Sequence, residues 1–208
     1  MTAGERCYKN GYQVMLFPYD GVTLTQPYGG SSYSHCCNTA TDWAQGVNQF
    51  PFYAPCDCFQ LYSGSGADNI TAYRSAHEVL TPSGVKYVAF LFMHDDTPPV
   101  FTGLIRQGAL IGHSGTAGIG TGDHSHLDQA TGQSATLIDS GYSCSIGVIN
   151  CFYLQNMLQP EQCYYLSGNE TVNTGSLTFQ TITGGTTGGG FKWWMSARQL
   201  KEVKKYNV

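Results

Sequence analysis

The longest apolar run of the chain covers residues 85–94, with the sequence VKYVAFLFMH. A nearly continuous apolar run of this length, bounded by turn-forming residues, is typical of a strand in a buried sheet. Residues 95–103, which include two consecutive prolines, follow it as a polar loop. The pattern therefore predicts a central buried strand that ends in a histidine, His94.

Shorter segments on both sides of this run also have strand-like patterns, separated by Gly, Pro, Asn and Asp residues that favour turns. The expected strands are residues 12–17, 23–25, 42–44, 56–62, 71–75, 78–80 and 104–111. Residues 139–145 are predicted to form a loop, and residues 151–157 a short helix or strand. Because few segments show helical periodicity, the predicted fold class is mainly β, an antiparallel β-sheet domain with a short C-terminal appendage.

The C-terminal part of the chain differs in composition from the rest. Residues 173–190 are rich in Gly and Thr, which is typical of a flexible linker that buries no core. Residues 191–208 combine aromatic and basic residues, and their second half can form a helix. We therefore expect a domain over residues 1–172, a linker over 173–190 and a tail over 191–208. The tail is either a helix packed on the domain or a docking segment that inserts its Trp pair into a partner.

Composition and charge exclude some classes of partner. Only 12% of the 208 residues are charged and the formal net charge is −4. A nucleic-acid-binding surface needs a clustered excess of Lys and Arg, so no nucleic-acid partner is expected. No segment approaches the roughly 18 apolar residues of a bilayer-spanning helix, and no signal peptide is recognisable. A protein of this kind that acts outside the cell would be delivered by lysis or within a particle.

The eight cysteines leave the redox state open, because an even number permits disulfides. Cys151 and Cys163 would form a local bridge. Cys36 and Cys37 are adjacent, a spacing unlike the repeated Cys-x(2–4)-Cys of structural zinc sites. A closed zinc site that includes these two thiolates stays an alternative, but it would leave no coordination position for water.

Two candidate metal-binding or catalytic histidines lie in the glycine-rich segment over residues 112–128, GHSGTAGIGTGDHSHLD. If the backbone is extended there, His124 and His126 point to the same side, because side chains alternate along a strand. One ring can then bind a metal ion while the other stands beside it. The alternative is a glycine-rich hairpin with two surface histidines. Three upstream residues beside predicted strands favour a shared site, namely His35, Asp42 and His94.

The order of these residues resembles that of the lysostaphin-type zinc metallopeptidases, from about Pro27 to Asp128. Two features depart from the common pattern of that family. His35 and Asp42 are seven residues apart rather than four, and Leu127-Asp128 follows the last histidine in place of Phe-Glu. The longer spacing, the segment PFYAPCDC and the Gly-Asp-His-x-His ending are similar to peptidase domains at phage tail tips and to phage lysins.

The resemblance implies that His35, Asp42 and His126 bind Zn²⁺. Two imidazoles and a carboxylate leave one tetrahedral position open, as in catalytic rather than structural zinc sites. The resemblance also implies that His94 and His124 are catalytic. One would accept the proton of the attacking water, and the other would hydrogen-bond the developing oxyanion. The sequence does not assign the two roles.

Other residues near these positions have weaker assignments. His77 and His113 match no position of the family pattern. Tyr28, Tyr33 and Asp123 are expected to line the groove beside the zinc site.

The predicted function is that of a zinc-dependent peptidoglycan endopeptidase, encoded by a phage and used for tail-tip wall penetration or host lysis. Expected partners are bacterial peptidoglycan peptides and other phage tail proteins, and the expected location is the virion tail or the lysing host. One alternative is a zinc-containing module that binds the wall or organises a tail without catalysis. Another is a zinc-free structural β protein held together by disulfides.

Overall fold

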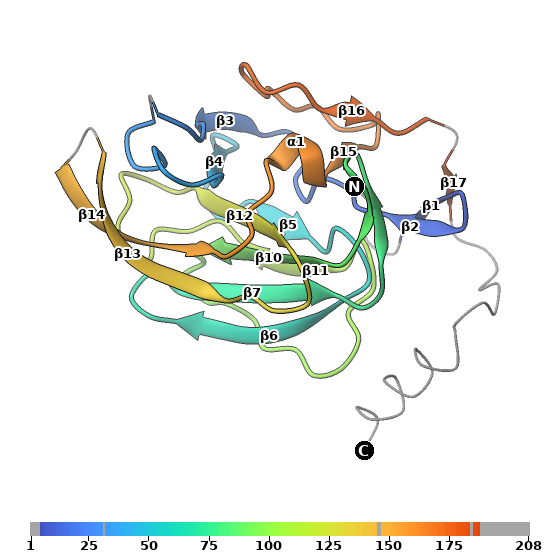
Figure 1. Ribbon diagram of the computed structural model, residues 1–208, viewed down its shortest axis with the longest axis horizontal. Helices are drawn as coiled ribbons and strands as arrows, with labels where there is room; N and C mark the ends of the chain where they lie inside the picture. Colours follow the sequence, from blue (N-terminus) through green and yellow to red (C-terminus); the bar gives the residue numbers. More distant parts are fainter. Residues whose placement is uncertain (1–4, 31, 145–146, 184, 188–208) are drawn as a thin grey trace.

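Six antiparallel strands in the order β3-β4-β12-β10-β7-β6 form the largest sheet (Figure 1). These strands are β3 (Thr23–Gln26), β4 (Thr41–Ala44), β6 (Cys58–Ser65), β7 (Ile70–Ser75), β10 (Val88–Met93) and β12 (Ser125–Thr131). Every residue of β10 is buried, as expected for the longest apolar run. The computed structural model describes residues 5–30, 32–144, 147–183 and 185–187, so the tail over 191–208 lies outside the described residues.

The remaining strands form smaller sheets around the large one. A five-stranded sheet contains β1 (Cys7–Lys9), β2 (Tyr12–Val14), β8 (Val79–Thr81), β9 (Gly84–Lys86) and β17 (Thr186–Thr187). Three further pairs are β5 (Pro51–Tyr53) with β11 (Leu110–His113), β13 (Leu137–Cys144) with β14 (Gly147–Leu154), and β15 (Tyr165–Leu166) with β16 (Gln180–Thr181). A single turn of helix, α1 (Pro160–Cys163), precedes β15. Most pairs are antiparallel, so the predicted mainly β class is confirmed. None of the helices in the described part of the chain has the length and apolar character of a bilayer-spanning segment.

Three local predictions are wrong. Residues 139–145, expected as a loop, lie largely in β13, which pairs along its whole length with β14 to form a hairpin (Figure 1). The strand expected over residues 104–111 is confined to the start of β11, because Gly108 has a positive φ and the Gln107 side chain donates to the carbonyls of Val14 and Pro55. Cys163 is a free thiol, so the expected bridge between Cys151 and Cys163 is absent.

The described part of the expected linker lies against the domain. The carbonyl of Asn173 accepts a hydrogen bond from the Leu24 N–H at 2.8 Å. The ring of Phe179 packs edge-on against Phe17 with 5.3 Å between ring centres, and Ile182 is buried. The division into a domain, a linker and a tail remains a prediction.

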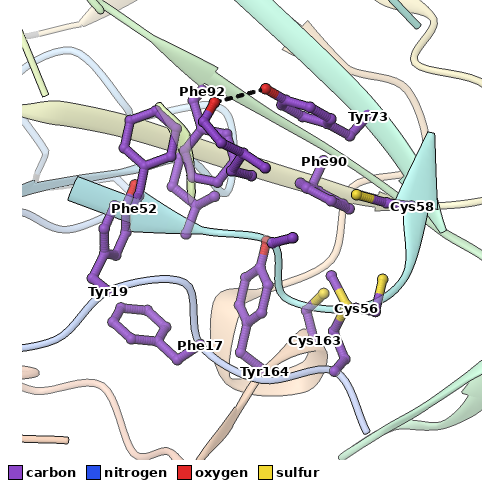
Figure 2. Packing of buried hydrophobic residues seen from close by; sticks show 14 of the residues in the cluster. Phe17, Tyr19, Phe52, Cys56, Cys58, Tyr73, Phe90, Phe92, Cys163 and Tyr164 are labelled. Atoms are coloured by element: carbon purple, nitrogen blue, oxygen red, sulfur yellow. Dashed lines mark hydrogen bonds between the residues drawn. The ribbon is translucent and has the colours of Figure 1, made fainter. Parts of the chain in front are cut away.

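Aromatic side chains fill the main core, which covers one face of the large sheet (Figure 2). Phe92 of β10 stacks on Phe52 of β5 with 4.1 Å between ring centres. Phe90 stacks on Tyr73 of β7, whose hydroxyl donates to the carbonyl of Ile111. Because fully burying one aromatic side chain contributes roughly 1.5–3 kcal/mol, these contacts hold β5 and β11 firmly on the sheet.

The alternation of side chains along the strands separates this core from the site. Trp43 of β4 and Leu127 of β12 belong to the main core. Their neighbours Asp42 and His126 therefore point to the other face of the sheet. A smaller apolar cluster on that face includes Leu91 and Met93 of β10. One face of the sheet therefore packs against the main core, and the polar side chains of the site lie at one end of the opposite face.

Glu170, which follows β15, makes the stability of the fold depend on pH. One carboxylate oxygen accepts a hydrogen bond from the Ser167 N–H, and the other is buried without a partner among the described residues. Burial raises the pKa of Glu170 to about 7. A raised pKa in the folded state means that this group's contribution is fully present below pH 4.5 and is lost as the pH rises through 7.

We therefore expect Glu170→Gln to remove this loss. At each pH, the free energy of unfolding of wild type is subtracted from that of Glu170→Gln. This difference should be more positive at pH 8 than at pH 4.5, by roughly 1–3 kcal/mol. Urea denaturation of both proteins at the two pH values measures this difference. Glu78→Gln at an exposed glutamate is the control and should leave the pH dependence unchanged. Equal pH dependence of Glu170→Gln and wild type would contradict the assignment.

Candidate metal centre

Pairing of β4 with β12 brings Asp42 and His126 together. The two residues are direct cross-strand partners, so their side chains leave the same face of the sheet. The Nδ1 atom of His126 lies 3.2 Å from Oδ1 of Asp42. On the opposite face, Ser125 is held by a 2.8 Å hydrogen bond to the buried hydroxyl of Tyr19. The main core therefore fixes the strand that carries the histidine.

His35 reaches the same carboxylate from the loop between β3 and β4. Its Nε2 atom lies 3.6 Å from Oδ1 of Asp42, and its ring centre is 4.9 Å from that of His126. The backbone of His35 is fixed by two hydrogen bonds, from its N–H to the Ser32 hydroxyl and from the Gly29 N–H to its carbonyl. The ring is almost fully buried, so the loop presents it to Asp42 and not to solvent.

His35, Asp42 and His126 form a group that could hold a metal ion. Each offers one ligand atom, and these atoms all lie within 4.8 Å of one another. Two imidazoles and a carboxylate are a donor set that suits Zn²⁺ and leaves a fourth position open. The ring nitrogens that face away from Asp42, Nδ1 of His35 and Nε2 of His126, are buried and have no partner among the described residues. Among the described residues, both rings are therefore oriented through their contact with Asp42.

The adjacent thiols do not close this site. Cys36 is disulfide-bonded and thus offers no thiolate, and Cys37 is exposed and free. Among the described residues, neither belongs to the group that could hold a metal ion. The donor set therefore favours an open site over a closed structural one.

His94 and His124 lie beside this group. Their ring centres are 4.4 Å apart, and Nε2 of His124 is 4.0 Å from Oδ2 of Asp42. His94 follows β10 directly, and strict alternation after Met93 would point it toward the main core. Its φ of 79° is left-handed, a conformation that few non-glycine residues adopt, and it redirects the side chain. The ring centre of His94 consequently lies 6.0 Å from that of His126.

Two backbone carbonyls determine where these rings carry their protons. The Nδ1 atom of His94 lies 2.7 Å from the carbonyl oxygen of Ala117, and Nδ1 of His124 lies 2.9 Å from that of Gly122. A carbonyl oxygen only accepts hydrogen bonds, so each neutral ring must carry its hydrogen on Nδ1. The Nε2 atom of both histidines is then left with a free lone pair that can accept a proton.

The electrostatics of the site favour the ligand forms of its residues. Burial lowers the pKa of His35 to about 4, although the Asp42 carboxylate opposes this effect. Burial alone would raise the pKa of Asp42, but His35 and His126 outweigh it and hold that pKa well below its usual range. For His126, burial lowers the pKa, but the hydrogen bond to Asp42 and the charges of Asp42 and Asp128 together outweigh it, so the pKa is raised. Metal binding requires deprotonated ligands, and His35 and Asp42 are in this form at neutral pH.

Burial also affects the neighbouring His94. It lowers the pKa of His94 to about 4, and the nearby His126 and His124 act in the same direction. His94 is therefore neutral at pH 7.

The remaining residues discussed in the sequence analysis make other contacts. The Tyr28 hydroxyl donates to Glu161 of α1, and Tyr33 is 61% exposed. Asp123 accepts hydrogen bonds from the Gln49 N–H and from the Ser114 hydroxyl, so it fixes the glycine-rich loop. His113 lies on β11, where its N–H donates to Asp95, and His77 lies beside Asp57 and Arg106.

Sequence reasoning missed the backbone groups of the site and the contribution of Asp128. The two carbonyls that orient His94 and His124 leave no signal in residue types. Asp128 is fully buried two residues beyond His126, and its carboxylate accepts the N–H groups of Gln129 and Leu154. Burial raises its pKa to about 6. Its link to Leu154 fastens β14 to β12, the strand that carries His126.

The fold and the side chains of the site define a mainly antiparallel β protein with a group of histidines and an aspartate that could hold a metal ion. The five side chains are His35, Asp42, His94, His124 and His126.

No family model matches the chain. A curated relative is morphogenesis protein 1 of Bacillus phage B103, which is 36% identical over 124 residues. The match covers 59% of this chain and 33% of the relative, so the chain spans about one third of the length of that protein.

Similar solved structures include three peptidases. A zinc-containing peptidase from Vibrio cholerae is 17% identical, with a TM-score of 0.44 over 60% of this chain and 42% of that one. A putative M23 peptidase from Pseudomonas aeruginosa is 17% identical, with a TM-score of 0.41 over 63% and 49%. The catalytic domain of lysostaphin from Staphylococcus simulans is 18% identical, with a TM-score of 0.39 over 61% and 84%.

Proposed function

We propose that the chain is a zinc-dependent endopeptidase that hydrolyses peptide bonds of bacterial peptidoglycan. The observation that carries the proposal is the convergence of His35, Asp42 and His126 with two further histidines, His94 and His124, at one end of the sheet. A structural metal site needs ligands only. The two additional rings, with free Nε2 lone pairs, supply groups that can move protons.

In this proposal His35, Asp42 and His126 hold the zinc ion. Zinc, when bound, polarises a carbonyl group and makes water more acidic. His94 or His124 accepts the proton of the attacking water at Nε2 and returns it to the leaving amine. The Nδ1–H bonds to Ala117 and Gly122 keep the accepting nitrogen directed away from the backbone.

The same hydrogen bonds limit which form of a histidine can donate a hydrogen bond to the developing oxyanion. A neutral ring whose hydrogen is held on Nδ1 has no hydrogen to donate at Nε2. The histidine that hydrogen-bonds the developing oxyanion must therefore be protonated on both nitrogens. Such a donor contributes about 3 kcal/mol in comparable sites. The proposed mechanism thus requires that this second histidine carry a proton on Nε2 when the oxyanion forms.

We also propose that the protein is encoded by a phage and acts on the wall of the host, either at the virion tail tip or during lysis. The similarity to a phage morphogenesis protein supports this part of the proposal. The presence of the chain in purified particles would favour the tail role. Its appearance only late in infection would favour lysis.

The test is mass spectrometry of peptidoglycan fragments after digestion by the purified, zinc-loaded protein. Walls from Bacillus and from other bacteria should yield fragments with new peptide amino termini. A chelator should abolish them, and added Zn²⁺ should restore them. One equivalent of zinc without cleavage of any wall would contradict the proposal and favour a non-catalytic wall-binding or tail module. The absence of bound zinc would instead favour a structural β protein.

A further inference from the structure

The glycine-rich loop between β11 and β12 contacts His94 and His124, the two histidines that lie beside the candidate metal ligands. Gly115 forms two backbone hydrogen bonds with His124, each 3.1 Å long. A Cβ atom added at Gly115 would lie 2.1 Å from the carbonyl oxygen of His94 and 2.8 Å from the N–H nitrogen of Asp96. The buried α-carbon of Gly115 thus fills the space between the backbones of the two histidines, with no room for a methyl group.

Gly120 has a similar relation to the ring of His124. A Cβ atom added there would lie 2.6 Å from Cε1 of that ring, and no other residue's atoms are among its nearest contacts. The ring cannot move aside without loss, because its Nδ1 atom is bonded to the Gly122 carbonyl and its face lies against His94. Neither Gly115 nor Gly120 has a left-handed φ, so space and not backbone conformation excludes a side chain.

We propose that Gly115 and Gly120 are positioning residues for the catalytic pair, Gly115 for the backbones of His94 and His124 and Gly120 for the His124 ring. This inference rests on the proposed function of the site. The nearest neighbours of a Cβ atom added at either glycine do not include His35, Asp42 or His126, so their effect is on the placement of the Nε2 atoms and not on metal binding.

Gly120→Ala is the sharper test, because the three atoms nearest to its methyl group all belong to the His124 ring. We expect one equivalent of zinc, an unchanged melting temperature within a few degrees, and a kcat about 10²-fold lower with little change in KM, since a displacement near 1 Å has that effect on a catalytic group. In the imidazole ¹⁵N spectrum of the zinc-loaded protein, the His124 signals should shift. The His35 and His126 signals should remain.

Gly115→Ala should change the imidazole signals of both His94 and His124, because its methyl group meets the His94 backbone. Should this variant fail to fold, Gly120→Ala alone decides the question. Gly30→Ala is the matched control, because a Cβ atom there would meet nothing within 4 Å. It should keep wild-type kcat, zinc content and spectrum.

Wild-type kcat in Gly120→Ala, with or without a shift of the His124 signals, would overturn the inference. Loss of zinc from Gly120→Ala would also overturn it, since the glycine would then act on the metal ligands. Failure of the proposed function is distinguishable, because wild-type protein would then hydrolyse no wall. The spectra would still show whether the glycines position the two rings, and unchanged His124 signals would overturn the inference in that case too.

Discussion

Replacing His126 by alanine should abolish both zinc binding and wall hydrolysis. His126 is the cross-strand partner of Asp42 and donates one of the three candidate ligand atoms. Without it, Asp42 and His35 alone cannot retain an ion with an open coordination position. We expect zinc content to fall from one equivalent to below about a tenth, and hydrolysis to fall by ~10³-fold or more.

The measurements are metal analysis by mass spectrometry and release of peptide amino termini from purified walls. His77→Ala is the control, because that histidine lies beside Asp57 and Arg106 and not at the site. It should keep zinc and activity. A His126→Ala protein that retained stoichiometric zinc would show that the metal is bound elsewhere, and the assignment of the centre would be wrong.

Replacing His94 by alanine should have a different result, in which zinc is retained and turnover is lost. The ring of His94 lies next to His124 and beside the ligand group. Its Nδ1 atom is bonded to a backbone carbonyl, and its Nε2 atom has no hydrogen-bond partner among the described residues. Removing a positioned proton-transfer group lowers rates by about 10²–10⁴-fold. We expect kcat to fall by this factor, with KM changed only slightly.

The left-handed backbone of His94 calls for a second variant. Asparagine tolerates positive φ better than most residues, so His94→Asn separates loss of the ring from loss of the local conformation. Both variants should bind one equivalent of zinc and lose activity to a similar extent. Unchanged hydrolysis of purified walls by His94→Ala would contradict the proposed roles of the two histidines.

Periodicity alone anticipated part of the geometry around Asp42. The alternation of side chains predicted that His124 and His126 lie on one side of an extended segment, and in the structure both rings approach Asp42. The apolar run over residues 85–94 predicted the buried strand that leads to His94. Both predictions depend on the pattern of side chains within a short segment, and this pattern can be read directly from one sequence.

Periodicity failed where distant segments decide the local conformation. Alternation along β10 would direct His94 toward the core, and its left-handed φ reverses this. The β13–β14 hairpin was missed because residues 139–145 have a polar, turn-like composition. That segment becomes a strand through its pairing with β14. Residues 104–111 were expected to form a strand, but side-chain hydrogen bonds of Gln107 to the carbonyls of Val14 and Pro55 hold part of that segment in another path.

The sequence by itself determined the β class, the buried central strand and the residue types of a candidate zinc site. These follow from side-chain hydrophobicity, turn propensity and donor chemistry, which are properties of single residues and short segments. Only the tertiary structure decided that β4 pairs with β12 in the register that joins Asp42 to His126. It alone placed the His35 loop over them and bonded the other two histidines to backbone carbonyls. The physical reason is that strand register and loop placement depend on packing between residues distant in sequence, and backbone carbonyls are the same in every residue.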